Sequence, residues 1–192
     1  EKLIELLERK VIGEVLFIRA DFGFKADLNP DGRIYNKSLG GGSLLDVGIY
    51  PIYMSLLVLG VPARIQSMAR FTASGVDIYC SMMFDYSNNS KASLESSVEA
   101  DTPTEAHIYG EKGWIKLHPR FHHAEKITLK VDGEEDEVID LKYEGNGYVH
   151  EISEVNRCVL NAQTESEKHS HARSIELSEL LDRVKDGIGL SY

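Results

Sequence analysis

Cysteine is scarce in this 192-residue chain, which contains only Cys80 and Cys158. Two cysteines this far apart match neither the spacing of a metal site nor the density of a disulfide-rich secreted protein. Their scarcity favours a reducing compartment, and we expect a cytoplasmic protein.

The chain also lacks an excess of basic residues. Its 31 acidic side chains outnumber 21 basic ones, which gives a formal net charge of -10. The lysines and arginines are scattered and form no basic stripe. A nucleic-acid partner is therefore not expected, because such partners are bound by clustered basic side chains.

Long apolar runs are missing as well. The most apolar candidate, residues 49–59, is shorter than the roughly 18 to 20 residues that a membrane span requires, and it includes Pro51 and two tyrosines. We expect no membrane partner. With 42% hydrophobic and 27% charged residues, the composition fits one globular domain or one large piece of a bigger protein. The start EKLIELLERK has no methionine and is already amphipathic, so we expect a piece.

Periodicity divides the chain into helices at both ends and strands between them. After an amphipathic helix, residues 14–24 read as a strand, and a second helix ends at about Leu59. Residues 63–141 form short alternating segments separated by turn residues, which predicts consecutive antiparallel strands. Two helices follow, at residues 148–162 and 172–187. This order indicates an α+β fold with a large, mostly antiparallel open sheet and helices on one face.

The other face of that sheet has no predicted cover. Its strands nevertheless carry apolar side chains, namely Met68, Phe71, Met83, Phe84, Ile108 and Trp114. A large apolar face of this kind is typical of an interface, so we expect it to pair with a second copy of the chain.

Three glycines, Gly40 to Gly42, open the second helix. A glycine-rich turn before a helix can bind phosphate on free backbone N–H groups. Dinucleotide-binding turns follow a strand in a βαβ unit, however, whereas this turn and Gly145-Asn146-Gly147 both lack that context. The sequence favours a flexible turn that lets the helix begin close to neighbouring backbone.

Inside the same helix, Asp46 and Tyr50 are four residues apart and share a face. Gly48 and Pro51 weaken the helix there, and Pro51 displaces the carbonyl of Val47, so a kink is expected. A carboxylate and a phenol beside helix breakers form a candidate site. The alternative is structural, with Asp46 pairing locally and Tyr50 filling the core, and composition alone favours that alternative.

The histidines give no metal signature. His122-His123 and His169-Ser170-His171 lack the helical spacing with an adjacent acid that a zinc site of the HExxH type requires. We interpret them as solvated loop residues and expect no metal.

Several segments together resemble one family. GGGSLLDVGIYPI resembles the substrate-domain motif of the glucose-fructose oxidoreductase and inositol dehydrogenase family (Gfo/Idh/MocA), in which a glycine-rich turn leads to D-x-G-x-H or D-x-G-x-Y. GEVLFIRADFGF, GEKGWIKL and the closing segments GYVHEISEVNRCVLNAQTES and SIELSELLDRVKDGIGLSY are similar to further family segments in the same order. The tyrosine form of the motif is most similar to the dihydrodiol and pentose dehydrogenase branch.

The resemblance implies one part of an NAD(P)-dependent oxidoreductase. Members combine an N-terminal Rossmann domain, with a nucleotide fingerprint and an E-K-P lysine, with a C-terminal domain like that of glyceraldehyde-3-phosphate dehydrogenase. Residues 1–192 match only the second part, which supplies substrate contacts and the subunit interface. The implied substrate is a secondary alcohol of a sugar, polyol or diol. We expect this piece alone to be inactive and to bind neither NAD nor NADP.

The resemblance also implies roles for individual residues. Tyr50 is implied as the group that hydrogen-bonds the reacting oxygen, and Asp46 as its neighbour that orients substrate. A free tyrosine has a pKa of about 10 and is a poor base, so the family's lysine is favoured as the proton acceptor. Candidate substrate contacts, with solvated surface as the alternative, are Asn29, Arg33, Lys37 and His150. The rival function is a small-molecule sensor or regulatory protein on the same fold.

Overall fold

The computed structural model describes residues 1–27, 29, 32–143, 145 and 147–192. In this part of the chain, one eight-stranded sheet has the order β2-β3-β4-β1-β5-β6-β7-β8. The strands are β1 (Val15–Gly23), β2 (Arg64–Phe71), β3 (Asp77–Asp85), β4 (Lys91–Ser97), β5 (Ala106–Gly110), β6 (Gly113–Leu117), β7 (Lys126–Val131) and β8 (Glu137–Asp140). The α-helices are α1 (Lys2–Glu8), α2 (Ile49–Leu59), α3 (Tyr148–Leu160) and α4 (His171–Ile188).

The predicted α+β class and the mostly antiparallel sheet are confirmed. Neighbouring strands pair antiparallel except at the centre, where β1 pairs with β4 in parallel, with Phe17 opposite Lys91. This parallel pair was not predicted. It joins strands separated by α2 and two other strands, so no hairpin pattern in the sequence could reveal it.

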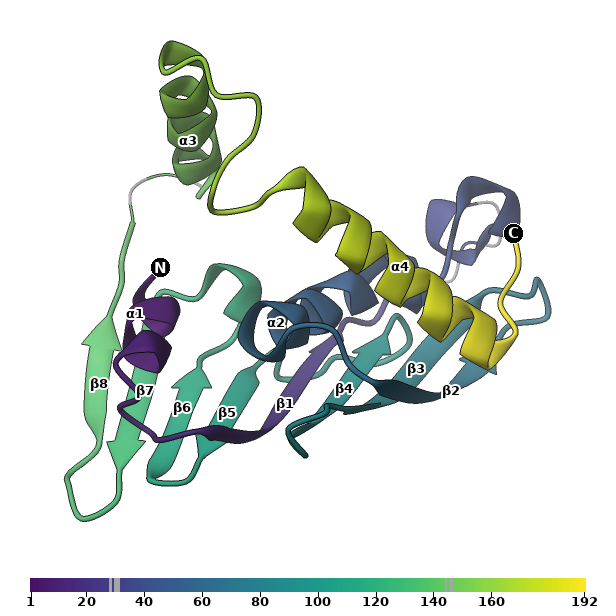
Figure 1. Cartoon of the computed structure of the whole chain (residues 1–192). Helices are drawn as coiled ribbons and strands as arrows, with labels where there is room; N and C mark the ends of the chain where they lie inside the picture. The colour runs from purple at the N-terminus through teal and green to yellow at the C-terminus, as the bar shows by residue number, and fades with distance from the viewer. Residues whose placement is uncertain (28, 30–31, 144, 146) are drawn as a thin grey trace.

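Helices α1, α2 and α4 lie on one side of the sheet (Figure 1). Alternate strand residues point toward them and form a large core, and a smaller cluster of four buried residues lies beside it. Phe84 and Ile108 are fully buried in this core. Their predicted place on the uncovered face was therefore wrong, because strand alternation turns both of them toward the helices.

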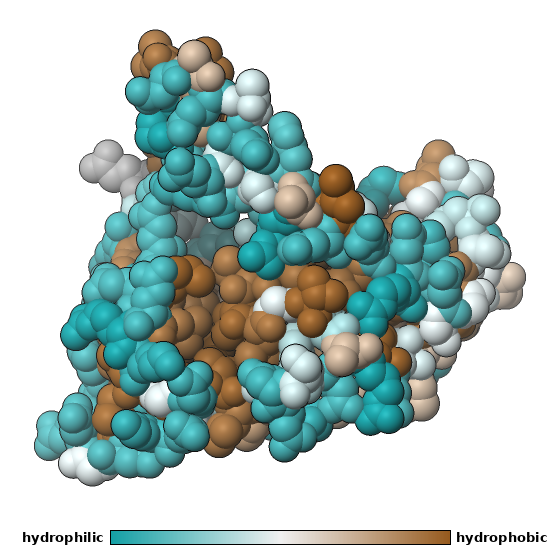
Figure 2. Space-filling view, in the orientation of Figure 1, coloured by the Kyte–Doolittle hydropathy of each residue, from teal (hydrophilic) through white to brown (hydrophobic). Residues whose placement is uncertain are grey.

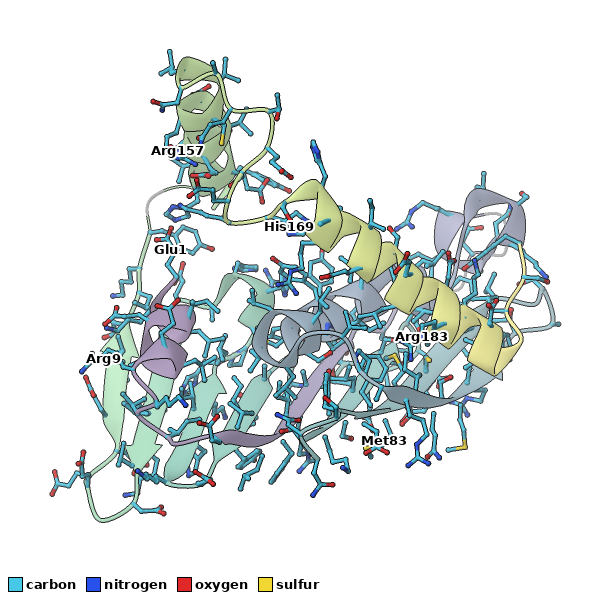
Figure 3. All side chains as sticks on the ribbon, in the orientation of Figure 1. Glu1, Arg9, Met83, Arg157, His169 and Arg183 are labelled. Atoms are coloured by element: carbon cyan, nitrogen blue, oxygen red, sulfur yellow. The ribbon has the colours of Figure 1, made fainter. Side chains whose placement is uncertain are left out.

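The uncovered face carries apolar side chains among charged ones. Met68 is 75% exposed and Met83 46% exposed, and Figure 3 shows Met83 pointing away from α4. Phe17, Tyr109 and Trp114 lie opposite one another across β1, β5 and β6, and the rings of Phe17 and Tyr109 stack at 4.3 Å. Ion pairs, such as Arg64 with Asp85, flank this row.

Helix α3 projects away from the sheet instead of covering it (Figure 1). Its connection to the body includes Lys168, whose Nζ lies 2.6 Å from Glu1 Oε1 and 3.4 Å from Glu154 Oε2. Its apolar residues remain exposed, among them Val159 at 69% and Leu160 at 85%, and apolar surface is visible at its free end (Figure 2). The sequence predicted this helix within two residues but could not predict where it lies.

The segment Lys37–Leu59 is 23 residues long with a hydropathy of 1.6, which suffices in length and composition for a membrane span. The prediction that no apolar segment reaches this length was therefore wrong, because the apolar character extends to the N-terminal side of residue 49. In the structure, 56% of the apolar window is buried inside the protein. Packing in the core accounts for its apolar character, as it does for core helices of soluble proteins.

The glycine turn allows the start of this segment to touch neighbouring backbone, as predicted. A Cβ on Gly41 would lie 2.4 Å from the carbonyl oxygen of Arg33, and one on Gly42 would lie 2.2 Å from Asp77 Oδ1. The turn's N–H groups are used internally: Gly41 donates to Asn36 O at 3.0 Å, and Gly42 to Ile34 O at 2.9 Å. Glycine is needed here for close approach.

Asp77 holds the first helical turn in place. Its Oδ2 accepts from the Ser43 hydroxyl and from the Leu44 N–H, both at 2.7 Å. Burial raises the pKa of this carboxyl above its ordinary value, although these two hydrogen bonds oppose the shift. The first turn of the helix is therefore anchored on β3 by a buried carboxylate.

The disturbance predicted near Pro51 is a π-helical turn, η3 (Leu44–Gly48), which leads directly into α2. Proline donates no N–H, and its ring crowds the carbonyl four residues earlier, here that of Val47. The regular α-helical hydrogen-bond pattern therefore cannot extend to the residues before Pro51. Such wide turns are frequent at functional sites. Asp46 lies within this turn, and Tyr50 in the first turn of α2.

Candidate functional site

Tyr50 lies against two other rings at one end of the sheet. Phe22 comes from the end of β1, and His122 from the short 3-10 helix η4 (Phe121–His123) that follows β6. The Tyr50 ring centroid is 5.2 Å from that of Phe22 and 4.8 Å from that of His122. Phe22 and His122 themselves stack at 4.9 Å, with 17° between their planes. Tyr50 is thus supported from one side and remains 39% exposed.

The hydroxyl of Tyr50 is available to a ligand. In the described part of the chain, no side chain or backbone group forms a hydrogen bond with it. A phenol with a partly exposed ring and a free O–H can donate one hydrogen bond and accept others. This arrangement suits a group that contacts a substrate oxygen.

Asp46 and Arg33 form an ion pair beside this helix. The Asp46 side chain is 18% exposed, whereas that of Arg33, from the 3-10 helix η1 (Arg33–Tyr35), is 56% exposed. Two predicted site residues are therefore brought together. Partly exposed pairs contribute little to stability, so the main effect is to hold a guanidinium near the start of α2. Its other N–H groups have no hydrogen-bond partner among the described residues.

His122 is exposed, as predicted for a loop residue, but one part of its ring lies against Phe22 and Tyr50. Partial desolvation, reinforced by the charges of His123 and Arg120, lowers its pKa to about 4. The imidazole is therefore neutral at pH 7 and offers one donor and one acceptor nitrogen. Sequence reasoning missed His122 because the sheet topology that brings it to Tyr50 is not visible in local patterns.

The next histidine connects this cluster to α3. His123 Nδ1 lies 3.0 Å from the Tyr143 hydroxyl, and the Tyr143 ring centroid lies 5.7 Å from that of His150 on α3. The structure thus places His150, a predicted substrate contact, next to Tyr143. Its link to Tyr50 runs through His123 and His122.

The other two predicted contacts lie elsewhere. Lys37, in the 3-10 helix η2 (Lys37–Leu39), lies over the turn between β2 and β3, where its Nζ would be 3.7 Å from a Cβ on Gly75. Asn29 is exposed in the loop after β1, and its carbonyl accepts from the Gly32 N–H at 3.0 Å. The structure does not bring Lys37 or Asn29 into the ring cluster around Tyr50.

The turn at Gly40 to Gly42 offers no fitting place for a dinucleotide. A pyrophosphate needs free N–H groups at a helix N-terminus, but those of Gly41, Gly42 and Leu44 are already donated to protein acceptors. In the second candidate turn, Asn146 lies outside the described residues. Among the residues that the structure describes, no group of three His, Cys, Asp or Glu side chains could hold a metal ion.

Curated relatives match the whole chain. It is 34% identical over 200 residues to trans-1,2-dihydrobenzene-1,2-diol dehydrogenase of Danio rerio, and 27% identical over 202 residues to the Homo sapiens protein of that name. Each match covers 100% of this chain and 59% of the relative. The chain therefore spans about three fifths of the length of these relatives.

Solved structures share the fold. Aldose-aldose oxidoreductase from Caulobacter crescentus, complexed with glycerol, matches with a TM-score of 0.83 at 18% identity, over 96% of this chain and 56% of that one. A 3-ketoreductase from Actinomadura kijaniata, in complex with NADP and TDP-benzene, matches with a TM-score of 0.82 at 21% identity, over 97% and 58%.

A family profile described as the GFO/IDH/MocA C-terminal domain matches residues 1–116. This range contains the glycine turn, Asp46 and Tyr50, and the strands from β1 to β5. The predicted family resemblance is confirmed: this chain belongs to the GFO/IDH/MocA C-terminal domain family.

Proposed function

We propose that this chain is the substrate domain of an NAD(P)-dependent oxidoreductase that acts on a secondary alcohol of a diol, sugar or polyol, or on the corresponding carbonyl. The observation that carries the proposal is the setting of Tyr50. Its ring lies against Phe22 and His122 beside the Asp46–Arg33 pair, and its hydroxyl forms no hydrogen bond with any described residue. Two comparisons support the proposal. The curated relatives are named as diol dehydrogenases, and one structural neighbour was solved in complex with NADP.

The chemistry assigned to the chain is binding and polarisation of the substrate oxygen. Oxidation of a secondary alcohol removes its hydroxyl proton, so a hydrogen-bonding group must lie within reach of that oxygen. Tyr50 supplies this group. Arg33, oriented by Asp46, can direct its remaining N–H groups to a neighbouring hydroxyl. A further domain of the full-length protein would hold the cofactor and supply the family's lysine as proton acceptor.

The first test separates the cofactor from this domain. The 192-residue chain is expected to bind NAD and NADP no tighter than about 100 µM, roughly 5.5 kcal/mol, because the N–H groups of Gly41, Gly42 and Leu44 are donated within the protein and cannot hold the pyrophosphate. Calorimetry measures this directly. The full-length protein, in contrast, is expected to bind the cofactor and to oxidise members of a panel of trans-diols, aldoses and polyols. Tight binding by the chain alone, or no turnover by the whole protein across the panel, would contradict the proposal.

We propose in addition that the uncovered sheet face forms a homodimer. Exposed Met68 and Met83, together with the Phe17, Tyr109 and Trp114 row, place apolar and aromatic side chains on one broad face. An isologous interface of ordinary size buries on the order of 1,500 Å² and has such residues near its centre.

Sedimentation of matched variants tests the dimer. The chain is expected to sediment as a dimer at tens of micromolar, and Met83→Asp to shift it to a monomer, because a carboxylate would be buried in the interface without a partner. Ile175→Asp is the control, since Ile175 is 59% exposed but lies on α4, across the sheet from the proposed interface. A monomeric wild-type chain, or equal dissociation by both variants, would rule out this interface.

A cytoplasmic location remains our proposal for the compartment. Both Cys80 and Cys158 are free and buried, which suits a reducing environment. Fractionation of cells that express the full-length protein would test it, and recovery outside the cytoplasm would contradict it.

A further inference from the structure

The ring of His122 is fixed more firmly than its place in a loop suggests. Its neighbour Phe121 is buried, with 3% of its surface exposed, and donates its N–H to Thr104 O at 3.1 Å. On the other side, His123 is hydrogen-bonded to Tyr143 through Nδ1. The two residues that flank His122 are therefore both held by other parts of the fold, and Arg120 begins the turn in the left-handed conformation at φ 62°.

The fixed imidazole and Phe22 together form the surface on which Tyr50 lies. The planes of Phe22 and His122 are nearly parallel, at 17°, and the Tyr50 ring is tilted by 42° to Phe22 and by 46° to His122. Aromatic pairs at these separations attract each other beyond the effect of the area that they bury. Tyr50 has no hydrogen bond through its hydroxyl within the described residues, so its ring contacts are what orient that hydroxyl.

We propose that His122 is a positioning residue for Tyr50: its ring, stacked on Phe22, sets the direction in which the Tyr50 hydroxyl points toward the substrate. The inference rests on the proposed role of Tyr50 in catalysis. His122 acts through Tyr50 and is assigned no proton transfer.

The protonation state of His122 is consistent with this role. Because partial desolvation of the ring lowers the pKa of the folded-state imidazole to about 4, below the ordinary value of 6.5, the folded state favours the neutral ring. Lowering the pH through this range costs folded-state stability, since the unfolded chain takes up the proton first. The neighbouring charges that contribute are those of His123 and Arg120.

The stack is tested in the 192-residue chain by NMR. The Cε1–H resonance of His122 is expected to titrate with a midpoint well below the ordinary histidine value of 6.5, and the midpoint is expected to rise in Tyr50→Ala, which uncovers one side of the imidazole. In His122→Ala, the Tyr50 ring resonances are expected to shift and average, whereas His122→Phe is expected to keep them close to wild type. An ordinary His122 midpoint, or an unchanged Tyr50 ring in His122→Ala, would overturn the inference.

Turnover by the full-length protein supplies the second test. His122→Ala is expected to lower kcat about tenfold with little change in KM, because a misdirected hydroxyl weakens the transition state more than binding. His122→Phe, which keeps a flat ring, is expected to recover kcat to within about threefold of wild type. His171→Ala is the control, since this exposed histidine lies outside the cluster. An equal loss in the alanine and phenylalanine variants would point to the imidazole nitrogens and overturn the positioning role.

A double-mutant cycle separates this inference from the proposed function. On a Tyr50→Phe background, adding His122→Ala is expected to cost less than about twofold more, because the hydroxyl that His122 directs is already gone. A full tenfold further loss would overturn the inference alone. If Tyr50→Phe by itself leaves turnover unchanged, the proposed function of Tyr50 fails, and the positioning role falls with it.

Discussion

Replacing Tyr50 with phenylalanine in the full-length protein is expected to lower turnover about a hundredfold, equivalent to about 2.7 kcal/mol of transition-state stabilisation. The substitution removes only the hydroxyl, and the ring keeps its contacts with Phe22 and His122. Folding is expected to change little, because the hydroxyl has no hydrogen-bond partner in the described part of the structure. Steady-state kinetics and thermal unfolding of the same preparations measure both effects.

Asp46→Asn is the companion variant. It keeps the size of the side chain but removes the charge that pairs with Arg33, so a smaller loss of turnover is expected. If both variants turn over normally while the melting temperature falls by several degrees, the two residues are structural. If Tyr50→Phe abolishes ligand binding in a protein that never shows turnover, the sensor on the same fold becomes the better assignment.

Gly42→Ala is expected to destabilise the 192-residue chain by about 3 kcal/mol, through overpacking and a strained backbone together. The new Cβ would lie 2.2 Å from Asp77 Oδ1, and the residue has a φ of 117°. Asp77 cannot yield easily, because its other oxygen holds Ser43 and Leu44. Urea unfolding followed by circular dichroism measures the change.

Gly40→Ala is the matched control in the same turn. Gly40 also has a positive φ, of 67°, but nothing lies within 4 Å of the Cβ it would gain. Its cost is expected to be about 1 kcal/mol, from backbone strain alone. Equal losses in the two variants would show that the contact with Asp77 does not decide the need for glycine at position 42.

Local patterns predicted most of the secondary structure. The helix predicted at residues 172–187 is observed as His171–Ile188, because apolar periodicity and a glycine stop signal are both local. The parallel pairing of β1 with β4 and the outward position of α3 were not predicted. Both depend on which distant segments meet, and an amphipathic pattern shows only that a helix has an apolar face.

The candidate site was predicted in part for the same reason. Asp46 and Tyr50 are recognisable because their spacing, the glycine turn and Pro51 all lie within one short segment. Arg33 was singled out as a loop cation, but its pairing with Asp46 follows from the fold. Phe22 and His122 were not predicted as site residues, since 28 and 72 residues separate them from Tyr50 along the chain.

The sequence by itself determined the α+β class, the glycine turn that opens the helix and the pair of Asp46 and Tyr50. Each of these depends on side-chain periodicity or on backbone restrictions within a few residues. The tertiary structure alone decided which strand faces reach the helices, that Asp77 anchors the turn, and that His122 is neutral beside Tyr50. These features arise where strands distant in sequence are brought side by side, and burial at such contacts changes both the packing and the protonation of a side chain.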